Sequence, residues 1–341
     1  MLANETVLIL GAGASADLDI PLGHELIFEI AKVANRLADP IQTALENHAP
    51  SDWRVDEVEM SPGAQVRQLQ GRLLNAAPRS IDRFLEENPS LANVGRLAIA
   101  GALLPKERPD YFALHPKRSI WYQWLWGEVY DVAKSWRDLR LSIITLNYDR
   151  TIESFLRHVC QNFYEGLDSE AVDKIVSKFN ILHLHGDLGP LDRVPFGGTE
   201  LHKGANLNLK RIAALLGKSA AGIKLMHEGG NYREAQGLLS RAKVVCFLGF
   251  GFHRDVMNRL FSGPAVGRPA GQRAVIYGSS KGMTEAERAQ VKSFFGSTGF
   301  SNAPYIDLHP GDCRETLRAK PVITIAPEAL GLREENLLDK I

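Results

Sequence analysis

The chain has 341 residues, of which 45% are hydrophobic and 23% charged, the ordinary balance of a globular protein in water. Its 40 Lys and Arg residues equal its 40 Asp and Glu residues, so no overall positive charge is available to hold nucleic acid or an anionic membrane. No apolar run approaches the roughly 20 residues of a membrane helix, and the first residues lack a signal-peptide pattern, so we expect a cytoplasmic protein without membrane contact.

Short apolar runs rich in β-branched residues recur along the chain and predict the strands of a sheet. Runs that are apolar at nearly every position are typical of parallel strands, because both faces of such strands are buried. Longer segments with helical periodicity alternate with them, which indicates a Rossmann-like, doubly wound α/β fold with about six strands. The predicted strands are residues 7–10, 141–145, 181–184, 244–248 and 274–277, with a weaker sixth at 305–308.

The interval between the first two predicted strands is far longer than a crossover helix requires. Apolar residues recur there at helical spacing, as from Leu26 to Leu37, so we predict a large helical insertion packed beside the sheet. The predicted division is a nucleotide-binding domain at 1–24 and 139–320, a helical insertion at 25–138, and a C-terminal tail at 321–341.

Four tryptophans gather near the end of the predicted insertion. Residues of this size most often fill a core. The alternative is an aromatic surface that mediates assembly or covers a crevice. The four are Trp121, Trp124, Trp126 and Trp136.

Each of the five stronger predicted strands ends in glycine or polar residues. In an open parallel sheet, the ligand crevice lies beyond the carboxyl ends of the strands. We therefore expect these ends to form the functional site. The segments are residues 11–16, 145–149, 185–187, 249–252 and 278–280.

The first of these segments reads GAGASA and fits the G-x-G-x-x-G/A dinucleotide pattern directly after a strand. Its glycines permit a tight turn, and the N–H groups at the following helix start can receive a diphosphate. We therefore expect Gly11, Ala12, Gly13 and Ser15 to contact a nucleotide. No strand ending in Asp or Glu follows about 20 residues later, which argues against an ordinary hydride-transfer dehydrogenase.

A second glycine segment, LGFGF at 248–252, follows the fourth predicted strand. Gly249 and Gly251 would let the ribose or adenine of a nucleotide approach the backbone, which is the reading we favour. The alternative is that these glycines only allow tight packing beneath the sheet.

Asn147 and Asp149 follow the second predicted strand and are offset by two residues, so both side chains can face the crevice. An Asx-type turn, in which one of them caps the next helix, is the structural alternative. Both interpretations place the pair at the same strand end.

His183 and His185 alternate onto one side of the third predicted strand. His183 lies within the apolar run and is expected to be a hydrogen-bonded structural residue. His185 stands at the strand end before a glycine, where a catalytic base would be placed. A metal site built from both histidines lacks a third ligand at suitable spacing.

Three cysteines occur in the chain, and they are far apart in the sequence. An odd number of widely spaced cysteines argues against a disulfide framework and against a zinc site made of paired thiolates. They are Cys160, Cys246 and Cys313.

In this order, the strand-end segments resemble the SIR2-like (sirtuin-related) family. The resemblance implies a Rossmann-like fold that binds NAD⁺. It places Asn147 and His185 at the family's catalytic Asn and His, Asp149 at the acid near the nicotinamide, and residues 11–15 at the phosphate loop, with Thr145 in the same cofactor site. The matching segments are GAGAS at 11–15, TLNYD at 145–149, LHG at 184–186, LGFGF at 248–252, Tyr277-Gly278, and SIDRFL at 80–85, which is similar to a segment in the inserted helices of bacterial SIR2-like defence proteins.

Two departures separate this chain from the protein-deacylating sirtuins. The four-cysteine zinc module is missing, so no zinc is expected, and DIPLGH at 19–24 stands where sirtuins carry a GIPDFR-like segment. In both respects the chain resembles the bacterial SIR2-like NADases of anti-phage systems. This resemblance implies hydrolysis of NAD⁺ to nicotinamide and ADP-ribose. The alternatives are a non-catalytic NAD or ADP-ribose sensor and an NAD-dependent protein deacylase. Family analogy further implies a homo-oligomer, with a separately encoded HerA-type ATPase or short Argonaute as partner.

Overall fold

The structure, a computed structural model, describes most of the chain. The described residues are 2–50, 53, 60–76, 78–113, 120–133, 139–198, 201, 208–225, 228, 230–261, 274–298, 300 and 305–325. Trp136 and the part of the predicted tail beyond residue 325 lie outside these ranges.

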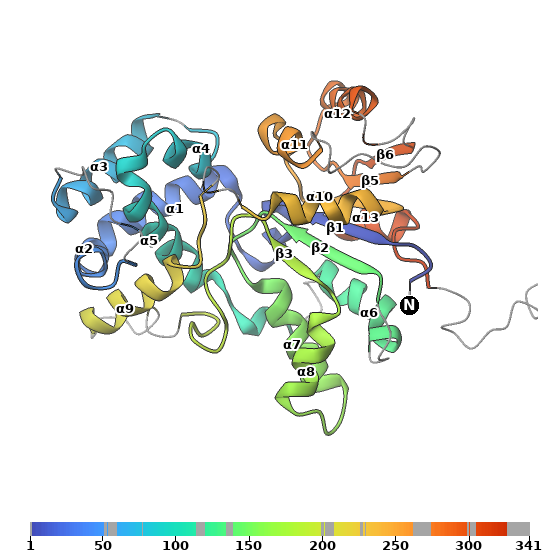
Figure 1. The fold of residues 1–341 in the computed structure, drawn as a ribbon, viewed down its shortest axis with the longest axis horizontal. Coiled ribbons are helices and arrows are strands. Elements are labelled where there is room, and N and C mark those ends of the chain that lie inside the picture. The colour runs from blue at the N-terminus through green and yellow to red at the C-terminus, as the bar shows by residue number, and fades with distance from the viewer. Residues whose placement is uncertain are drawn as a thin grey trace, which may run out of the picture.

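Within the described ranges, six parallel strands form one sheet (Figure 1). The strands are β1 (Thr6–Leu10), β2 (Leu141–Thr145), β3 (Ile181–His183), β4 (Val244–Leu248), β5 (Val275–Ser279) and β6 (Tyr305–His309). They lie in the order β3-β2-β1-β4-β5-β6, the arrangement of Rossmann-like sheets. At the centre, Leu8 lies beside Ile143 and Cys246 in register. The predicted α/β fold with six strands is therefore confirmed, including the weaker sixth strand.

Helices cover both faces of the sheet. Successive strand residues point to opposite sides, so the apolar side chains of each strand must be buried on both faces. One face carries α6 (Trp121–Ala133), α7 (Thr151–Phe163) and α13 (Cys313–Ala319), with α8 (Ser169–Ser177) outside α7. The other carries α10 (Tyr232–Arg241), α11 (Arg254–Phe261) and α12 (Glu285–Ser297) (Figure 1). Leu8 and Leu10 pack in the first layer, whereas Val7 and Ile9 pack in the second. The burial of both strand faces explains their nearly continuous apolar sequences.

The remaining helices form a lobe beside the sheet (Figure 1). Its members are α1 (Gly23–Arg36), α2 (Ala38–Asn47), α3 (Pro62–Ala76), α4 (Ile81–Glu86), α5 (Ala92–Leu103) and α9 (Leu209–Ala220). α5 is buried along its length at the lobe's centre, and α9 joins from a later part of the chain by packing on α2 and α5. The predicted insertion at 25–138 includes α6, yet α6 packs on α7 and α13 beneath the sheet.

The tryptophans of α6 point into the protein. Trp121 and Trp126 are buried, and Trp124 packs partly buried against the same core. Trp121 Nε1 donates a hydrogen bond to Ala14 O at 2.7 Å, which ties α6 to the turn after β1. These three side chains therefore fill the core, as one of the two interpretations of the sequence holds.

Candidate functional site

The glycine segments after β1 and β4 pack against each other at the centre of the sheet. The strand order reverses there, and the crevice of an open α/β sheet lies at such a point. Gly11 N–H donates to Leu248 O at 3.0 Å, and Gly13 N–H donates to Gly249 O at 2.9 Å. A Cβ atom on Gly11 would lie 2.6 Å from Gly249 O, so a side chain would not fit. Gly249 thus allows tight packing, which is the alternative to nucleotide contact that the sequence leaves open. It lies beside the predicted phosphate loop.

Residues 11–15 form a compact turn whose backbone is largely satisfied within the protein. Four N–H groups in this segment, those of Gly11, Gly13, Ala14 and Ser15, donate to backbone carbonyls. The end of β5 contributes as well, because Ser279 Oγ accepts a hydrogen bond from the Gly249 N–H at 2.8 Å. A diphosphate at this loop would therefore meet the half-buried Ala12 N–H before the others.

Gly249→Ala is expected to lower the free energy of unfolding by at least about 2 kcal/mol, because φ at this residue is +58° and a new Cβ would lie 2.6 Å from Gly13 Cα. Gly71→Ala on α3 is the matched control, since a Cβ there meets nothing within 4 Å, and it should be neutral or stabilise by up to about 1 kcal/mol. Urea unfolding measures both. Equal stability of the two variants would show that the two glycine segments do not pack as described.

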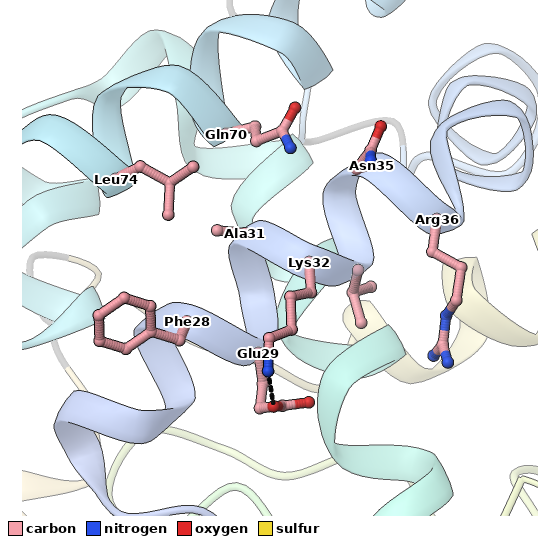
Figure 2. A pocket seen from close by; sticks show the side chains of 9 residues that line it. Phe28, Glu29, Ala31, Lys32, Asn35, Arg36, Gln70 and Leu74 are labelled. Carbon is pink, nitrogen blue, oxygen red and sulfur yellow. Dashed lines mark hydrogen bonds and ion pairs between the residues drawn. The ribbon is translucent and has the colours of Figure 1, made fainter.

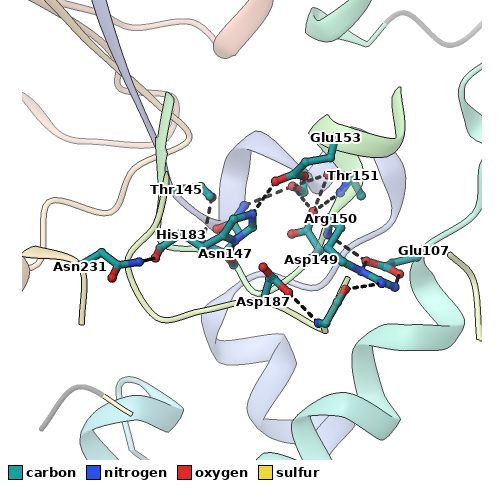
Figure 3. A network of polar contacts seen from close by, with 12 residues as sticks. Glu107, Thr145, Asn147, Asp149, Arg150, Thr151, Glu153, His183, Asp187 and Asn231 are labelled. Carbon is teal, nitrogen blue, oxygen red and sulfur yellow. Dashed lines mark hydrogen bonds and ion pairs between the residues drawn. The ribbon is translucent and has the colours of Figure 1, made fainter. Parts of the chain in front are cut away.

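The side chain of Asn147 lies where the ends of β1 and β2 meet. Its Nδ2 group donates to Gly11 O at 3.1 Å and to Ser15 Oγ at 3.2 Å. Its backbone N–H donates to Thr145 Oγ1 at 3.1 Å, so Thr145 helps to hold it in place (Figure 3). Because both amide protons are used in this way, Oδ1 is the atom that remains to accept a hydrogen bond from water or a ligand.

Asp149 is buried in a cluster of hydroxyl groups. Ser15 Oγ donates to Asp149 Oδ1 at 3.2 Å, and Thr151 donates to the same oxygen from its hydroxyl and, at 3.2 Å, from its backbone N–H. Tyr122 OH lies 2.8 Å from Thr151 Oγ1. Burial raises the pKa of Asp149, and the two bonds from Thr151 oppose that rise. The Thr151 contacts form an Asx turn at the start of α7, while the Ser15 contact joins the carboxylate to the glycine loop.

His183 and His185 contact helices on opposite faces of the sheet. His183 Nε2 lies 2.6 Å from Glu153 Oε1 of α7, and its Nδ1 lies 2.8 Å from Asn147 O (Figure 3). His185 Nε2 lies 3.4 Å from Tyr232 OH of α10. The expectation that both rings lie on one side of the strand is therefore wrong, because β3 ends at His183 and the alternation of an extended strand does not continue beyond it.

The ring of His185 is enclosed by aromatic side chains. The ring centroids of Tyr232 and Tyr148 lie 5.9 and 6.3 Å from it, and His185 is only 3% exposed. Burial lowers its pKa from the ordinary 6.5, with Asp82 opposing the shift and Arg259 adding to it. The ring is therefore neutral at pH 7. Its buried Nδ1 has no hydrogen-bond partner among the described residues, so it can accept one from a ligand.

The sequence interpretation assigned no role to the residues that α4 brings beside His185. Tyr148 OH donates a hydrogen bond to Asp82, and Glu86 pairs with Arg259 of α11 at 3.1 Å. These contacts join α4 to the end of β2 and to α11, which lies in the same helix layer as α10 and α12. In the sequence, only the SIDRFL segment at 80–85 points to α4, and it assigns no role to any of the residues there.

Two hollows on the described surface lie along α1. One, of about 450 Å³, lies between α1 and α3, with the exposed Phe28 and Leu74 at its edge (Figure 2). The other, of about 600 Å³, is bordered by Ala16 and by residues 19–22, which follow the glycine loop. Neither is lined by Asn147 or His185, so these hollows are separate from the predicted catalytic side chains.

Three further properties bear on the function. Among the described residues, no group of three His, Cys, Asp or Glu side chains is arranged to hold a metal ion. The three cysteines are free and buried. None of the helices in the described part of the chain has the length and apolar character needed to span a membrane.

Comparisons with known proteins give no independent assignment. No protein-family model matches this chain, and no curated protein matches it. A functional interpretation therefore rests on the sequence motifs and on the geometry of the strand ends.

Proposed function

We propose that this chain is an NAD⁺ glycohydrolase that cleaves the nicotinamide–ribose bond and releases nicotinamide and ADP-ribose. The observation that carries the proposal is the placement of Asn147, whose amide is fixed by Gly11 and Ser15 so that Oδ1 remains as an acceptor. Asn147 lies at the switch point of the sheet, which is where open α/β folds bind dinucleotides. The resemblance of the strand-end segments to the SIR2-like family adds to this support.

Hydrolysis replaces the bond from C1′ to the nicotinamide nitrogen with a bond from C1′ to the oxygen of water. Nicotinamide leaves as a neutral molecule and needs no general acid, so the site must accommodate oxocarbenium character at C1′ and admit a water, as glycosidases do. Asn147 Oδ1 would orient the water, and Nδ1 of the neutral His185 would take its proton or bind the ribose hydroxyls.

The remaining predicted contacts hold the rest of the substrate. The diphosphate would bind at the loop of Gly11, Ala12, Gly13 and Ser15, where the Ala12 N–H is the donor that remains for it. The adenosine half would lie against the exposed Gly251, while Gly249 packs on the loop beneath it. Asp149 would receive the nicotinamide carboxamide, which requires it to exchange one of its present contacts with Ser15 or Thr151. Binding of the adenosine half orients the half that reacts.

Substrate must also reach His185, which is enclosed in this structure. Tyr148, Tyr232 and the contacts of α4 surround the ring. The proposal therefore requires α4 or one of the two tyrosines to move when the dinucleotide binds, in the manner of an active-site lid.

The direct test is incubation of the purified chain with NAD⁺ and chromatographic separation of the products. We expect nicotinamide and ADP-ribose to accumulate, and His185→Ala to lower the rate at least about 100-fold because a general base is lost. His24→Ala, which changes an exposed histidine on α1, is the matched control and should keep the rate of the unmodified chain. A fully active His185→Ala variant would contradict the mechanism.

A second candidate is a non-catalytic sensor of NAD⁺ or ADP-ribose. The enclosure of His185, with 3% of its surface exposed, favours this alternative. A sensor would bind ADP-ribose in calorimetry, release no nicotinamide, and keep its affinity in His185→Ala.

The resemblance extends the proposal to bacterial anti-phage defence in the cytoplasm, with the chain acting as a homo-oligomer and with a separately encoded ATPase or Argonaute partner. The NAD⁺ assay is therefore repeated with such partners present. Activity that appears only with a partner would support a regulated effector, and an absence of nicotinamide under every condition would favour the sensor.

A further inference from the structure

We propose that His183 and Glu153 form a charged pair that positions Asn147 for the reaction. The inference rests on the proposed function, because it assigns a task to side chains that support Asn147. His183 is a positioning residue here, since its ring contacts the Asn147 backbone and the α7 carboxylate (Figure 3). The sequence alone predicts only a hydrogen-bonded structural role for His183.

The partners of the ring define its protonation. Asn147 O is a carbonyl oxygen and can only accept, so Nδ1 of His183 must carry a proton at this 2.8 Å contact. Nε2 faces a Glu153 carboxylate oxygen at 2.6 Å, and an ionised carboxylate also only accepts. With both nitrogens donating, His183 is an imidazolium that bridges the end of β2 to α7.

The charges around His183 agree with that assignment. Glu153 on α7, Asp187 after β3 and Asp149 after β2 are the charged groups that act on it. Although burial opposes the charged ring, Glu153 and Asp187 raise the pKa of His183 to about 9. Glu153 Oε2 is buried without a partner in the described ranges, so the imidazolium is the cation that compensates this carboxylate.

The pair completes the support of Asn147 on all of its polar backbone atoms. Thr145 Oγ1 accepts from the Asn147 N–H, and His183 donates to its carbonyl oxygen. Asn231 holds His183 from the far side, because its Nδ2 donates to His183 O at 2.9 Å. Loss of the His183 contact would free the peptide group that sets the direction of the Asn147 amide, and small misplacements of a catalytic group cost about 100-fold in rate.

The test compares the pH dependence of kcat in the unmodified chain and in Glu153→Gln. Since the pKa of His183 is raised, the imidazolium is present below about 9. Above that pH, Nε2 loses its proton and its lone pair faces the Glu153 carboxylate, so α7 no longer holds the ring against the Asn147 carbonyl and kcat of the unmodified chain should fall. Gln keeps the shape and an acceptor oxygen but not the charge, so this fall should move at least about one pH unit lower. The KM for NAD⁺ should change little. Glu170→Gln, at an exposed ion pair on α8, should leave the profile unchanged.

A second measurement is independent of catalysis. An NMR titration of ¹⁵N-histidine-labelled protein, with the His183 signals assigned from His183→Gln, should show both ring nitrogens protonated at pH 7 in the unmodified chain. Titration of His183 near 6.5 would overturn the charged pair, even in a chain that cleaves NAD⁺. If the fall of kcat near pH 9 were unchanged in Glu153→Gln, the role of the charged pair in positioning Asn147 would be overturned. If no NAD⁺ is cleaved, the proposed function and the positioning role fail together, while the titration still decides the protonation state.

Discussion

Asn147→Ala is expected to lower the rate of NAD⁺ cleavage by roughly 100- to 1000-fold, the usual cost of removing one preorganised polar group from an active site. The amide is held by Gly11 and Ser15, so its Oδ1 is oriented before substrate arrives. Alanine removes the group that orients water at C1′ and leaves the diphosphate contacts in place. The affinity for ADP-ribose, measured by calorimetry, should therefore change no more than a few-fold.

A loss of structure must be separated from a loss of chemistry in this variant. Asn147→Ala removes two hydrogen bonds, each worth about 0.5–1.5 kcal/mol, and a domain of this size should remain folded. Asn162→Ala is the matched control, because that exposed amide donates to His158 O of its own helix. Full activity in Asn147→Ala with an unchanged circular dichroism spectrum would remove Asn147 from the mechanism.

The fold was largely predictable because its signal is local. A strand buried on both faces must be apolar at nearly every position, so runs such as the one ending at Leu10 mark the sheet directly. The lobe was less predictable. α9 follows β3 only after a long interval of sequence, and only tertiary packing places it against α2 and α5. The packing of α6 beneath the sheet depends in the same way on distant contacts.

The site was predictable only as a set of strand ends. The carboxyl ends of neighbouring parallel strands must converge, which correctly brings Asn147 to the glycine loop. The orientation of each side chain depends on where a strand stops. β3 stops at His183, so His185 turns toward Tyr232 instead of following its neighbour toward α7.

Long-range polar pairs left no signal in the sequence. Glu153 is an ordinary first-turn acid of α7 by its position, and Asp82 is an ordinary first-turn acid of α4. Their partners, His183 and Tyr148, lie on other elements, and no periodicity connects residues across such distances. The same holds for the most deeply buried ion pair among the described residues, between Glu107 and Arg150.

Arg150→Ala is expected to lower the free energy of unfolding by about 3–5 kcal/mol, since it leaves the Glu107 carboxylate buried without its cation. Both side chains are at most 3% exposed. Arg150 Nη1 also donates to Gly189 O at 2.7 Å and to Val194 O at 2.6 Å, so one guanidinium joins the lobe to the start of α7 and to the loop after β3 (Figure 3). Urea unfolding monitored by tryptophan fluorescence gives the difference.

Arg108→Ala is the control, because it removes a neighbouring arginine whose ion pair with Asp110 is exposed to solvent. Exposed pairs contribute up to about 1 kcal/mol, and the stacking of Arg108 on Tyr111 adds a similar amount at most. Combining Arg150→Met with Glu107→Leu removes both charges, so the double variant should lose less stability than Arg150→Ala despite the unpaired carbonyls of Gly189 and Val194. If Arg150→Ala and Arg108→Ala lowered the free energy of unfolding equally, the buried Glu107–Arg150 pair would not hold the lobe to the strand ends.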